Sequence, residues 1–255
     1  MIKLNNVRAG YDGIEILHGI SLEVKSGESL SIIGPNGCGK TTLLRCIAGI
    51  LPFSGEILIN GADIRKLKQK ELSKKVAMLS QMTGIYFSYT VFDTVMMGRF
   101  AHDDGKLFNS SQEIDEEISL NALKILGLSD LKDREINTLS GGQIQRVFLA
   151  KIIAQDPDVI LLDEPTNHLD LSFQIELITF LKTLQKKGKT IIGVLHDINL
   201  AMKLSENVLL MDEGNVALHG KNKEVYSSKK LSEIYKVDIH SYMLETLEKW
   251  KNIKS

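Results

Sequence analysis

An excess of charge of one sign is absent from this chain, because 31 lysine and arginine residues are balanced by 32 aspartate and glutamate residues. A strongly charged surface is therefore not indicated, and we expect no nucleic-acid partner. Long apolar runs are absent as well, since no apolar segment approaches membrane-spanning length. We also expect no signal peptide, because Met1 leads directly into the alternating sequence IKLNNV. We expect a soluble protein that docks, if at all, on a membrane partner.

Cysteine is scarce, and the two that occur, Cys38 and Cys46, lie in and just after a glycine-rich stretch. A disulfide between them would distort the backbone of that stretch. Reduced thiols and a cytosolic setting therefore fit the sequence better than an oxidising compartment. The position of Cys38 also leads to the hypothesis that alkylation or oxidation of its thiol affects function.

The length of 255 residues predicts one large domain, or a domain with a subdomain, and no internal repeat divides it. Apolar and polar residues alternate from position 2 to 24, and GEILING ends in the hairpin dipeptide Asn60 and Gly61, so antiparallel strands are expected early in the chain. Nearly uninterrupted apolar runs at 76–81, 158–163 and 190–195 predict buried strands, the last two of them parallel and central.

Residues 82–155 have a mostly helical periodicity, which predicts a helical subdomain. Within it Ile114, Ile118, Ala122 and Ile125 fall on one stripe and are expected to share a face. Residues 221–255 form a charged tail with a helical pattern, too short for a further regulatory domain. We therefore expect a single domain over 1–255 that includes this helical part and a short C-terminal tail.

A glycine-rich turn follows an apolar strand pattern at 29–33 and opens onto an amphipathic helix pattern. It fits G-x-x-x-x-G-K-[ST], whose backbone N–H groups cradle phosphates. Lys40 is expected against the β- and γ-phosphates of a nucleotide, and the Thr41 hydroxyl on Mg²⁺. The expected nucleotide-binding residues here are Gly34, Pro35, Asn36, Gly37, Cys38, Gly39, Lys40, Thr41 and Thr42. Such a loop alone does not separate a kinase, a GTPase, a helicase and a transporter motor.

A second stretch, LSGGQ, opens a further helix and offers free backbone N–H groups to an anion. Its expected ligand residues are Ser140, Gly141, Gly142 and Gln143. Read alone, the stretch is equally well an ordinary capped helix start. Further along, an apolar strand ends in Asp163 and Glu164, which provides one carboxylate for Mg²⁺ and another for an attacking water.

In this order the motifs resemble those of the ATP-binding cassette family, and the match covers nearly the whole chain. GPNGCGKT resembles the Walker A loop, LSGGQ the family signature, and VILLD followed by Glu164 the Walker B segment. Tyr11 resembles the aromatic residue that stacks on adenine, Gln81 the glutamine of the Q-loop, and His196 the switch histidine. The resemblance implies an α/β fold with a P-loop NTPase core, a mostly parallel sheet, an N-terminal antiparallel β-subdomain and a helical subdomain that carries the signature.

The resemblance also implies a site shared between two copies of the chain. In the family two such domains pack head to tail, so each ATP lies between one Walker A loop and the opposite LSGGQ, and Asp170 in the D-loop segment 167–170 adds to the nucleotide site. The implied metal ligands are Thr41, Gln81 and Asp163, and the implied catalytic residues are Lys40, Gln81, Glu164 and His196. Taken singly, Glu164 would be an ordinary surface carboxylate and His196 a histidine capping a strand. Their places at the carboxyl ends of central strands favour the catalytic roles.

Two interpretations of the segment after Gln81 stay open. Its apolar and aromatic run at 85–91 fits the core of the helical subdomain. In the family this region also forms the groove that receives a coupling helix from the membrane subunits, so some of these residues would be a partner surface.

Finer resemblance links TVFDTVMMGRFAH and HDINLAMKLSENVLLMDEGNVALHG to the ATPases of importers for iron-siderophore, haem and cobalamin complexes. It implies three partners: membrane-spanning permease subunits, a second copy of the chain and, indirectly, an extracellular substrate-binding protein. The chain would then lie at the cytoplasmic side of the cell membrane as a peripheral subunit. Ile144 and the run 151–153 depart from the commoner family pattern, but neither falls on a catalytic position.

A soluble cassette ATPase of the cluster-assembly type is the alternative, because it would use the same ATP chemistry without a membrane partner. A P-loop kinase is disfavoured, since it would leave LSGGQ and the D-loop unexplained. The sequence does not identify the cargo, which in such systems is chosen by other subunits.

Overall fold

The computed structural model describes residues 1–80, 89–102, 110–167 and 169–253. The strands are β1 (Ile2–Tyr11), β2 (Ile14–Val24), β3 (Ser29–Ile33), β4 (Ser54–Ile59), β5 (Ala62–Asp63), β6 (Val76–Leu79), β7 (Val159–Asp163), β8 (Thr190–Val194), β9 (Asn207–Asp212) and β10 (Asn215–Lys221). The α-helices are α1 (Lys40–Ile47), α2 (Gln69–Lys75), α3 (Val91–Met96), α4 (Ser110–Ile125), α5 (Gly141–Gln155), α6 (Leu171–Lys186), α7 (Ile198–Leu204), α8 (Asn222–Tyr226), α9 (Lys229–Tyr235) and α10 (Ile239–Ile253). Short 3-10 helices are η1 (Ile64–Lys66), η2 (Met97–Ala101), η3 (Ser129–Leu131) and η4 (Ile136–Thr138).

The N-terminal strands form an antiparallel sheet in the order β2-β1-β4-β5. In β1 and β2 the alternating pattern places one set of side chains inside, and Ile2 pairs with Val24 and Leu4 with Leu22. These four side chains are almost fully buried. Asn60 and Gly61 make the tight turn between β4 and β5, so the antiparallel strands and the hairpin are as the sequence predicts.

The central sheet has the order β10-β9-β3-β8-β7-β6, and its strands are parallel apart from the antiparallel edge strand β10. All five residues of β3, of β7 and of β8 are buried, which explains why the sequences of β7 and β8 are almost continuously apolar rather than alternating. The strand β3 lies in the middle of the sheet and leads into the glycine-rich loop. The carboxyl ends of β3, β8 and β7 therefore lie side by side at one edge.

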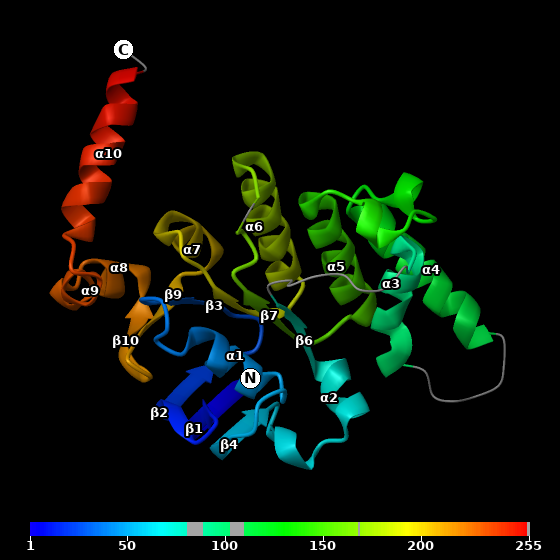
Figure 1. Ribbon diagram of the computed structural model, residues 1–255, viewed down its shortest axis with the longest axis horizontal. Coiled ribbons are helices and arrows are strands. Elements are labelled where there is room, and N and C mark those ends of the chain that lie inside the picture. Colours follow the sequence, from blue (N-terminus) through cyan, green and yellow to red (C-terminus); the bar gives the residue numbers. More distant parts are fainter. Residues whose placement is uncertain (81–88, 103–109, 168, 254–255) are drawn as a thin grey trace.

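The two faces of the central sheet are covered by different layers. Leu30 and Ile32 of β3 pack in a cluster with the antiparallel sheet and α1. Ile33 packs in a second cluster with α5, α6 and α7. Figure 1 shows the same arrangement, with β1, β2 and β4 on one side of the central sheet and the longer helices on the other. The helix α1 and the helix α5 consequently lie on opposite faces of the sheet.

The described part of the predicted helical subdomain contains α3, η2, α4, η3, η4 and α5. The predicted stripe on α4 is wrong at its ends, because Ile114 is 56% and Ile125 48% exposed. The buried face is turned so that Ala122 and Leu123 point inward. A polar contact lies on the packed side of the helix as well: Asp115 accepts a hydrogen bond from Arg99 Nε at 2.7 Å. A pattern that counts only apolar residues misses such a charged pair on the packed face.

Only part of the aromatic segment after β6 lies within the described residues, since 81–88 fall outside them. Val91 is fully buried, whereas Tyr89 is 45% and Phe100 69% exposed. The buried Val91 therefore fits the interpretation as core, and the exposed Tyr89 and Phe100 fit the interpretation as a partner surface. The division of the chain into subdomains stays a prediction.

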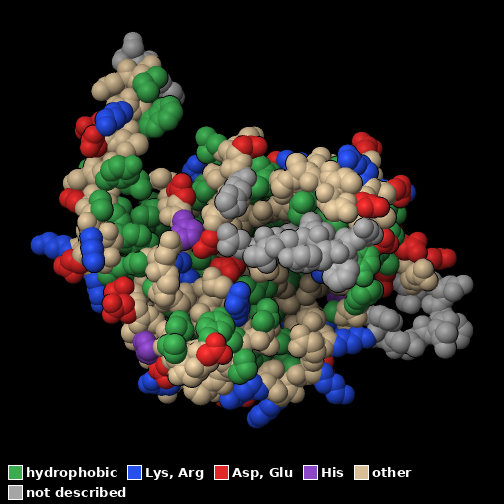
Figure 2. Space-filling model, in the orientation of Figure 1, with side chains coloured by type: hydrophobic (Ala, Val, Ile, Leu, Met, Phe, Trp, Pro, Cys, Tyr) green, Lys and Arg blue, Asp and Glu red, His purple; other side chains and the backbone are tan. Residues whose placement is uncertain are grey.

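The C-terminal segment folds into α8, α9 and α10, and α10 projects from the body of the protein (Figure 1). Its first residue, Ile239, is buried, but Tyr242, Leu247 and Trp250 are at least half exposed. Hydrophobic side chains gather along α10 and around its base (Figure 2). Within the described residues no helix combines the length and apolar character needed to cross a bilayer.

Candidate nucleotide site

The loop between β3 and α1 has a backbone that only glycine fits at its first position. Gly34 has φ 146°, and a Cβ atom there would lie 2.2 Å from the Met211 carbonyl oxygen and 2.9 Å from Cys38 Sγ. Gly39, at φ 99°, is the residue from which α1 starts. The sequence between these two glycines therefore curls tightly over the start of α1, as phosphate-binding loops do.

Lys40 is held by the loop itself. Its side chain is buried, and Nζ donates to the carbonyl oxygens of Gly34 at 2.8 Å and Pro35 at 2.7 Å. Cys38 Sγ lies 3.9 Å from the same nitrogen. The ammonium group is thus fixed at the inner side of the loop, where a phosphate chain would pass.

Thr41 and Asp163 join the loop to the end of β7. Thr41 Oγ1 donates to Asp163 Oδ1 at 2.9 Å. Asp163 is 5% exposed, and burial raises the pKa of its carboxyl group. The sequence predicts both residues as Mg²⁺ ligands, and the pair offers the oxygen donors that this ion prefers.

Glu164 and His196 also meet, although they are 32 positions apart: His196 Nε2 and Glu164 Oε1 are 2.5 Å apart. The Glu164 N–H donates to the Val194 carbonyl at 3.1 Å, which ties the ends of β7 and β8 together. Asn167 Nδ2 donates to the other carboxylate oxygen of Glu164 at 2.5 Å. Two neighbours therefore orient this carboxylate at the strand ends.

The LSGGQ segment is the start of α5. Ser140 caps the helix by accepting a hydrogen bond from the Gln143 N–H at 3.4 Å, while the Gln143 side chain accepts one from the Ser140 N–H at 3.0 Å. A Cβ atom at Gly141 or at Gly142 would meet no atom of the described residues within 4 Å. Both interpretations of this segment thus remain compatible with the geometry: it is a capped helix start, and its glycines face open space.

The other expected nucleotide ligands are more scattered. Tyr11 is 37% exposed at the end of β1, and its hydroxyl accepts a hydrogen bond from Arg45 Nη1 at 3.2 Å. Asp170 caps α6 by accepting from the Phe173 N–H at 2.8 Å. Gln81 lies outside the described residues, so its expected place in the site stays a prediction.

Sequence reasoning did not find three contacts of this site. The sequence indicates Asn167 only as part of the D-loop segment and not as a partner of Glu164. Gln145 donates from Nε2 to the Pro165 carbonyl and so links α5 to the segment after Glu164. Tyr235 Oη accepts from the Gly34 N–H at 2.9 Å. No local signal marks Tyr235, because its partner is 201 positions away in the sequence.

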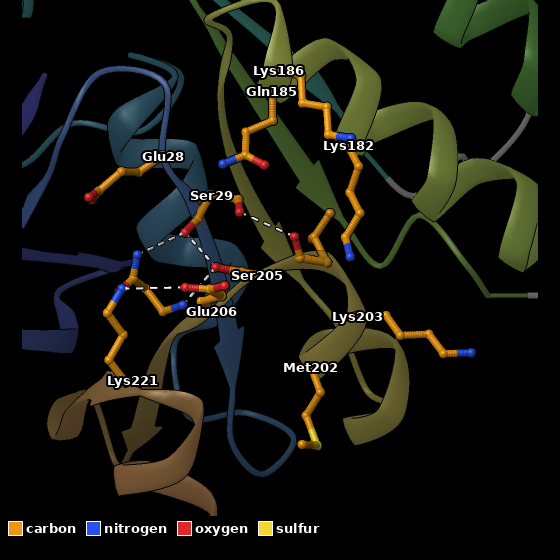
Figure 3. Close-up of a pocket in the computed structure, with 12 residues that line it drawn as sticks. Glu28, Ser29, Lys182, Gln185, Lys186, Met202, Lys203, Ser205, Glu206 and Lys221 are labelled. Atoms are coloured by element: carbon orange, nitrogen blue, oxygen red, sulfur yellow. Dashed lines mark hydrogen bonds and ion pairs between the residues drawn. The ribbon is translucent and has the colours of Figure 1, made fainter.

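A surface hollow elsewhere on the protein is not part of this site. It lies between the ends of α6 and α7 and the starts of β3 and β9, and is lined by Ser29, Lys182, Lys203, Glu206 and Lys221 among others (Figure 3). This is the amino edge of the parallel sheet, opposite the edge where β3 leads into the loop. Ligands of such sheets bind at the carboxyl edge, so the loop site and not this hollow is the candidate.

The comparison with known proteins decides the family. The family model described as ABC transporter matches residues 17–167, which is more than half of the chain. The chain belongs to the ABC transporter family. It is 38% identical to the petrobactin import ATP-binding protein YclP of Bacillus subtilis, over 94% of each chain. It is 36% identical to the ferric enterobactin transport ATP-binding protein FepC of Escherichia coli, over 89% of this chain and 83% of that one.

A solved structure of an ABC cassette agrees with the fold. The dimeric, post-hydrolysis state of an ATP-binding cassette bound to ADP and Pi superposes with a TM-score of 0.76 and 31% identity, and covers 87% of this chain and 98% of that one. The predicted family and fold class are thereby confirmed. This ABC protein is an ATPase that uses ATP as its nucleotide. The roles of single residues stay predictions.

Proposed function

We propose that this chain is the ATP-hydrolysing subunit of a membrane importer, and that its cargo is an iron chelate, haem, cobalamin or a related metal complex. Relatives whose names carry petrobactin import and ferric enterobactin transport match it over most of their length. The importer part of the proposal rests on these relatives, and the observation that carries the ATP-hydrolysing part is the meeting of two pairs, Thr41 with Asp163 and Glu164 with His196, at the carboxyl edge of the central sheet. These pairs lie beside the loop that holds Lys40.

The chemistry that this arrangement supports is phosphoryl transfer to water. Lys40 would bind the β- and γ-phosphate oxygens, and Thr41 and Asp163 would hold Mg²⁺. The ion would neutralise charge on the phosphate oxygens when bound with ATP. Glu164 would orient the attacking water and accept its proton, and His196 would fix the Glu164 carboxylate and contact the γ-phosphate region.

The site is proposed to be completed by a second copy. Because α1 and α5 cover opposite faces of the sheet, the LSGGQ segment of one chain lies at the start of a different layer from its own P-loop. The head-to-tail pairing that the family resemblance implies would bring Ser140 and Gly142 to the nucleotide site of the partner copy. A pair of chains would work on two permease subunits at the cytoplasmic face of the membrane, with an extracellular binding protein delivering the cargo. The cluster-assembly alternative shares the ATP chemistry and differs only in its partners.

The variant Glu164→Gln tests the catalytic assignment. We expect kcat for ATP hydrolysis to fall about 100- to 10 000-fold, since a general base is removed, while ATP still binds and holds two copies together. The measurements are phosphate release and light scattering with and without ATP. Glu248→Gln, which removes the same charge from the exposed face of α10, is the matched control. A Glu164→Gln protein that hydrolyses ATP normally and stays monomeric with ATP would contradict the proposal.

A further inference from the structure

The C-terminal segment is hydrogen-bonded to the nucleotide loop. Tyr235 is the last residue of α9, and its hydroxyl oxygen accepts a hydrogen bond of 2.9 Å from the Gly34 N–H. Gly34 is buried, and a buried N–H without an acceptor costs stability. The hydroxyl of a residue far along the chain is thus the acceptor for the first amide of the P-loop.

The local structure on both sides of Tyr235 is well defined. Ser228 caps the start of α9 by accepting from the Lys230 N–H at 3.2 Å, and Leu231 of the same helix is 1% exposed. The chain then turns sharply at Lys236, which has φ 56°. Both the helix before Tyr235 and the turn after it are therefore fixed.

The start of α10, directly after this turn, packs against the body of the protein. Ile239 is buried in the same core cluster, and Met243 packs partly against it. Met243 Sδ also lies 3.9 Å from Asn199 Nδ2, in the helix that follows the His196 segment. Tyr235 before the turn thus contacts the P-loop and Met243 after it contacts α7, while the turn residues 236–238 themselves are exposed.

Gly34 connects the hydrogen bond with Tyr235 to the side chain of Lys40. The Gly34 N–H is bound by Tyr235, and the Gly34 carbonyl accepts from Lys40 Nζ at 2.8 Å. The Met211 carbonyl leaves no room for a side chain beside Gly34. Holding this residue on its amide side therefore fixes the oxygen that positions the lysine.

We propose that Tyr235 is a positioning residue for nucleotide binding, which acts through Gly34 on the P-loop and on Lys40. The inference rests on the proposed role of the P-loop and adds the C-terminal segment to the site. Burial raises the pKa of the Tyr235 hydroxyl, so it stays neutral near pH 7.

The protein contains a matched control in Tyr226, at the end of α8. This tyrosine belongs to the same core cluster, and among the described residues its buried hydroxyl has no hydrogen-bond partner. Tyr226→Phe and Tyr235→Phe thus remove the same atom from the same region. Only Tyr235→Phe also removes an acceptor from the P-loop.

The experiment compares the two variants as full-length protein. For Tyr235→Phe we expect KM for ATP to rise about three- to tenfold with kcat little changed, as the loss of one hydrogen bond would produce. We also expect faster solvent exchange of the Gly34 amide proton, followed by NMR. For Tyr226→Phe both quantities should equal those of the unmodified chain. A purely structural effect would lower the folded fraction in both variants and leave KM of the folded fraction unchanged.

The outcomes separate the inference from the function on which it rests. An unchanged KM and an unchanged Gly34 amide in Tyr235→Phe would overturn the role of Tyr235, and so would equal effects of the two variants. Lys40→Ala is measured alongside, and loss of its nucleotide binding supports the P-loop site whatever Tyr235 does. Normal ATP binding by Lys40→Ala would overturn the site itself.

Discussion

At the level of single residues, the backbone conformation of Glu164 at the end of β7 determines where its carboxylate points. Its φ is 52°, in the left-handed region that costs a non-glycine residue roughly 1–3 kcal/mol. The conformation is held by its own N–H, which bonds to the Val194 carbonyl, and by Asn167 and His196 at the carboxylate. The backbone therefore turns away from β7 directly after Asp163, and the two adjacent carboxylates point to different partners.

Cys38 leads to a prediction that differs from the hypothesis raised by the sequence. Cys38 is 4% exposed and Cys46 is fully buried. Burial raises the pKa of the Cys38 thiol above its ordinary value, and it raises the pKa of the Cys46 thiol to about 12. Because the thiolate is the reactive form, we expect maleimide to label both thiols at least about tenfold more slowly than an exposed cysteine at pH 7.5.

Mass spectrometry of the native protein over time measures this rate, with a Cys added on the exposed face of α10 by Lys251→Cys as the reference. The labelling rate of the reference cysteine should level off once its thiol is fully ionised. The labelling rate of the two native thiols should still increase above that pH. Rapid labelling of Cys38 at neutral pH with loss of ATPase activity would contradict the prediction and restore the hypothesis.

Sequence reasoning at this scale finds residues whose partners follow from a motif and misses those whose partners do not. Lys40, Thr41 and Asp163 meet as the motif order predicts. Tyr235 could not be found, because a hydroxyl that accepts one backbone hydrogen bond leaves no pattern in the sequence. The same holds for Gln145, whose contact with the Pro165 carbonyl depends on how α5 packs.

At the scale of the elements, η2 and α5 approach each other more closely than ordinary helices do. A Cβ atom at Gly98 would lie 2.4 Å from the Lys151 carbonyl oxygen and 3.1 Å from the Gln155 N atom. Beside this contact, Arg99 Nη1 donates to the Ala154 carbonyl at 2.6 Å. Gly98 thus permits the packing that brings the charged pair of Arg99 and Asp115 between the helices.

Two glycines of this helical layer therefore respond differently to the same substitution. Gly98→Ala should lower the free energy of unfolding by about 1–3 kcal/mol, because its new methyl group overlaps backbone atoms. Gly142→Ala should leave that free energy unchanged or raise it by up to about 1 kcal/mol. It should nevertheless lower ATPase activity, since the open space beside it is where the partner's nucleotide is proposed to lie.

Urea denaturation and ATP turnover per folded molecule measure the two effects separately. Full ATPase activity in Gly142→Ala would contradict the shared site, and an unchanged stability of Gly98→Ala would contradict the close approach of η2 and α5.

The type of each long element is predictable from its apolar period, whereas the rotation of α4 is not. The packed side of α4 includes Asp115, which is bonded to Arg99, and hydrophobic periodicity does not count such a pair.

At the scale of the whole protein, the parallel sheet separates two kinds of surface. Its carboxyl edge carries the Lys40, Glu164 and His196 groups, which the sequence predicts because strand ends and motifs coincide. The amino edge carries the lysine-lined hollow (Figure 3). The order of the layers follows from the apolar patterns, but the direction of α10 does not, because most of its apolar side chains, Trp250 among them, are exposed.

Membrane association is the prediction for the whole assembly. Affinity purification of the full-length chain from detergent-solubilised membranes of its native host should recover a polytopic membrane protein as a stoichiometric partner. Glu164→Gln with ATP should be recovered with the same partner, since the substitution leaves the surface unchanged. Recovery of soluble assembly factors alone would favour the cluster-assembly alternative.

The exposed face of α10 has an optical consequence. The chain has one tryptophan, Trp250, which is 66% exposed near the end of the projecting helix. Tryptophan emission of this protein is therefore a signal from α10 and its surroundings, while the nucleotide loop and both hydrophobic clusters are spectroscopically silent at that wavelength. Unfolding of the hydrophobic clusters has to be followed by another probe. A partner that covers α10 would shift the wavelength of the tryptophan emission.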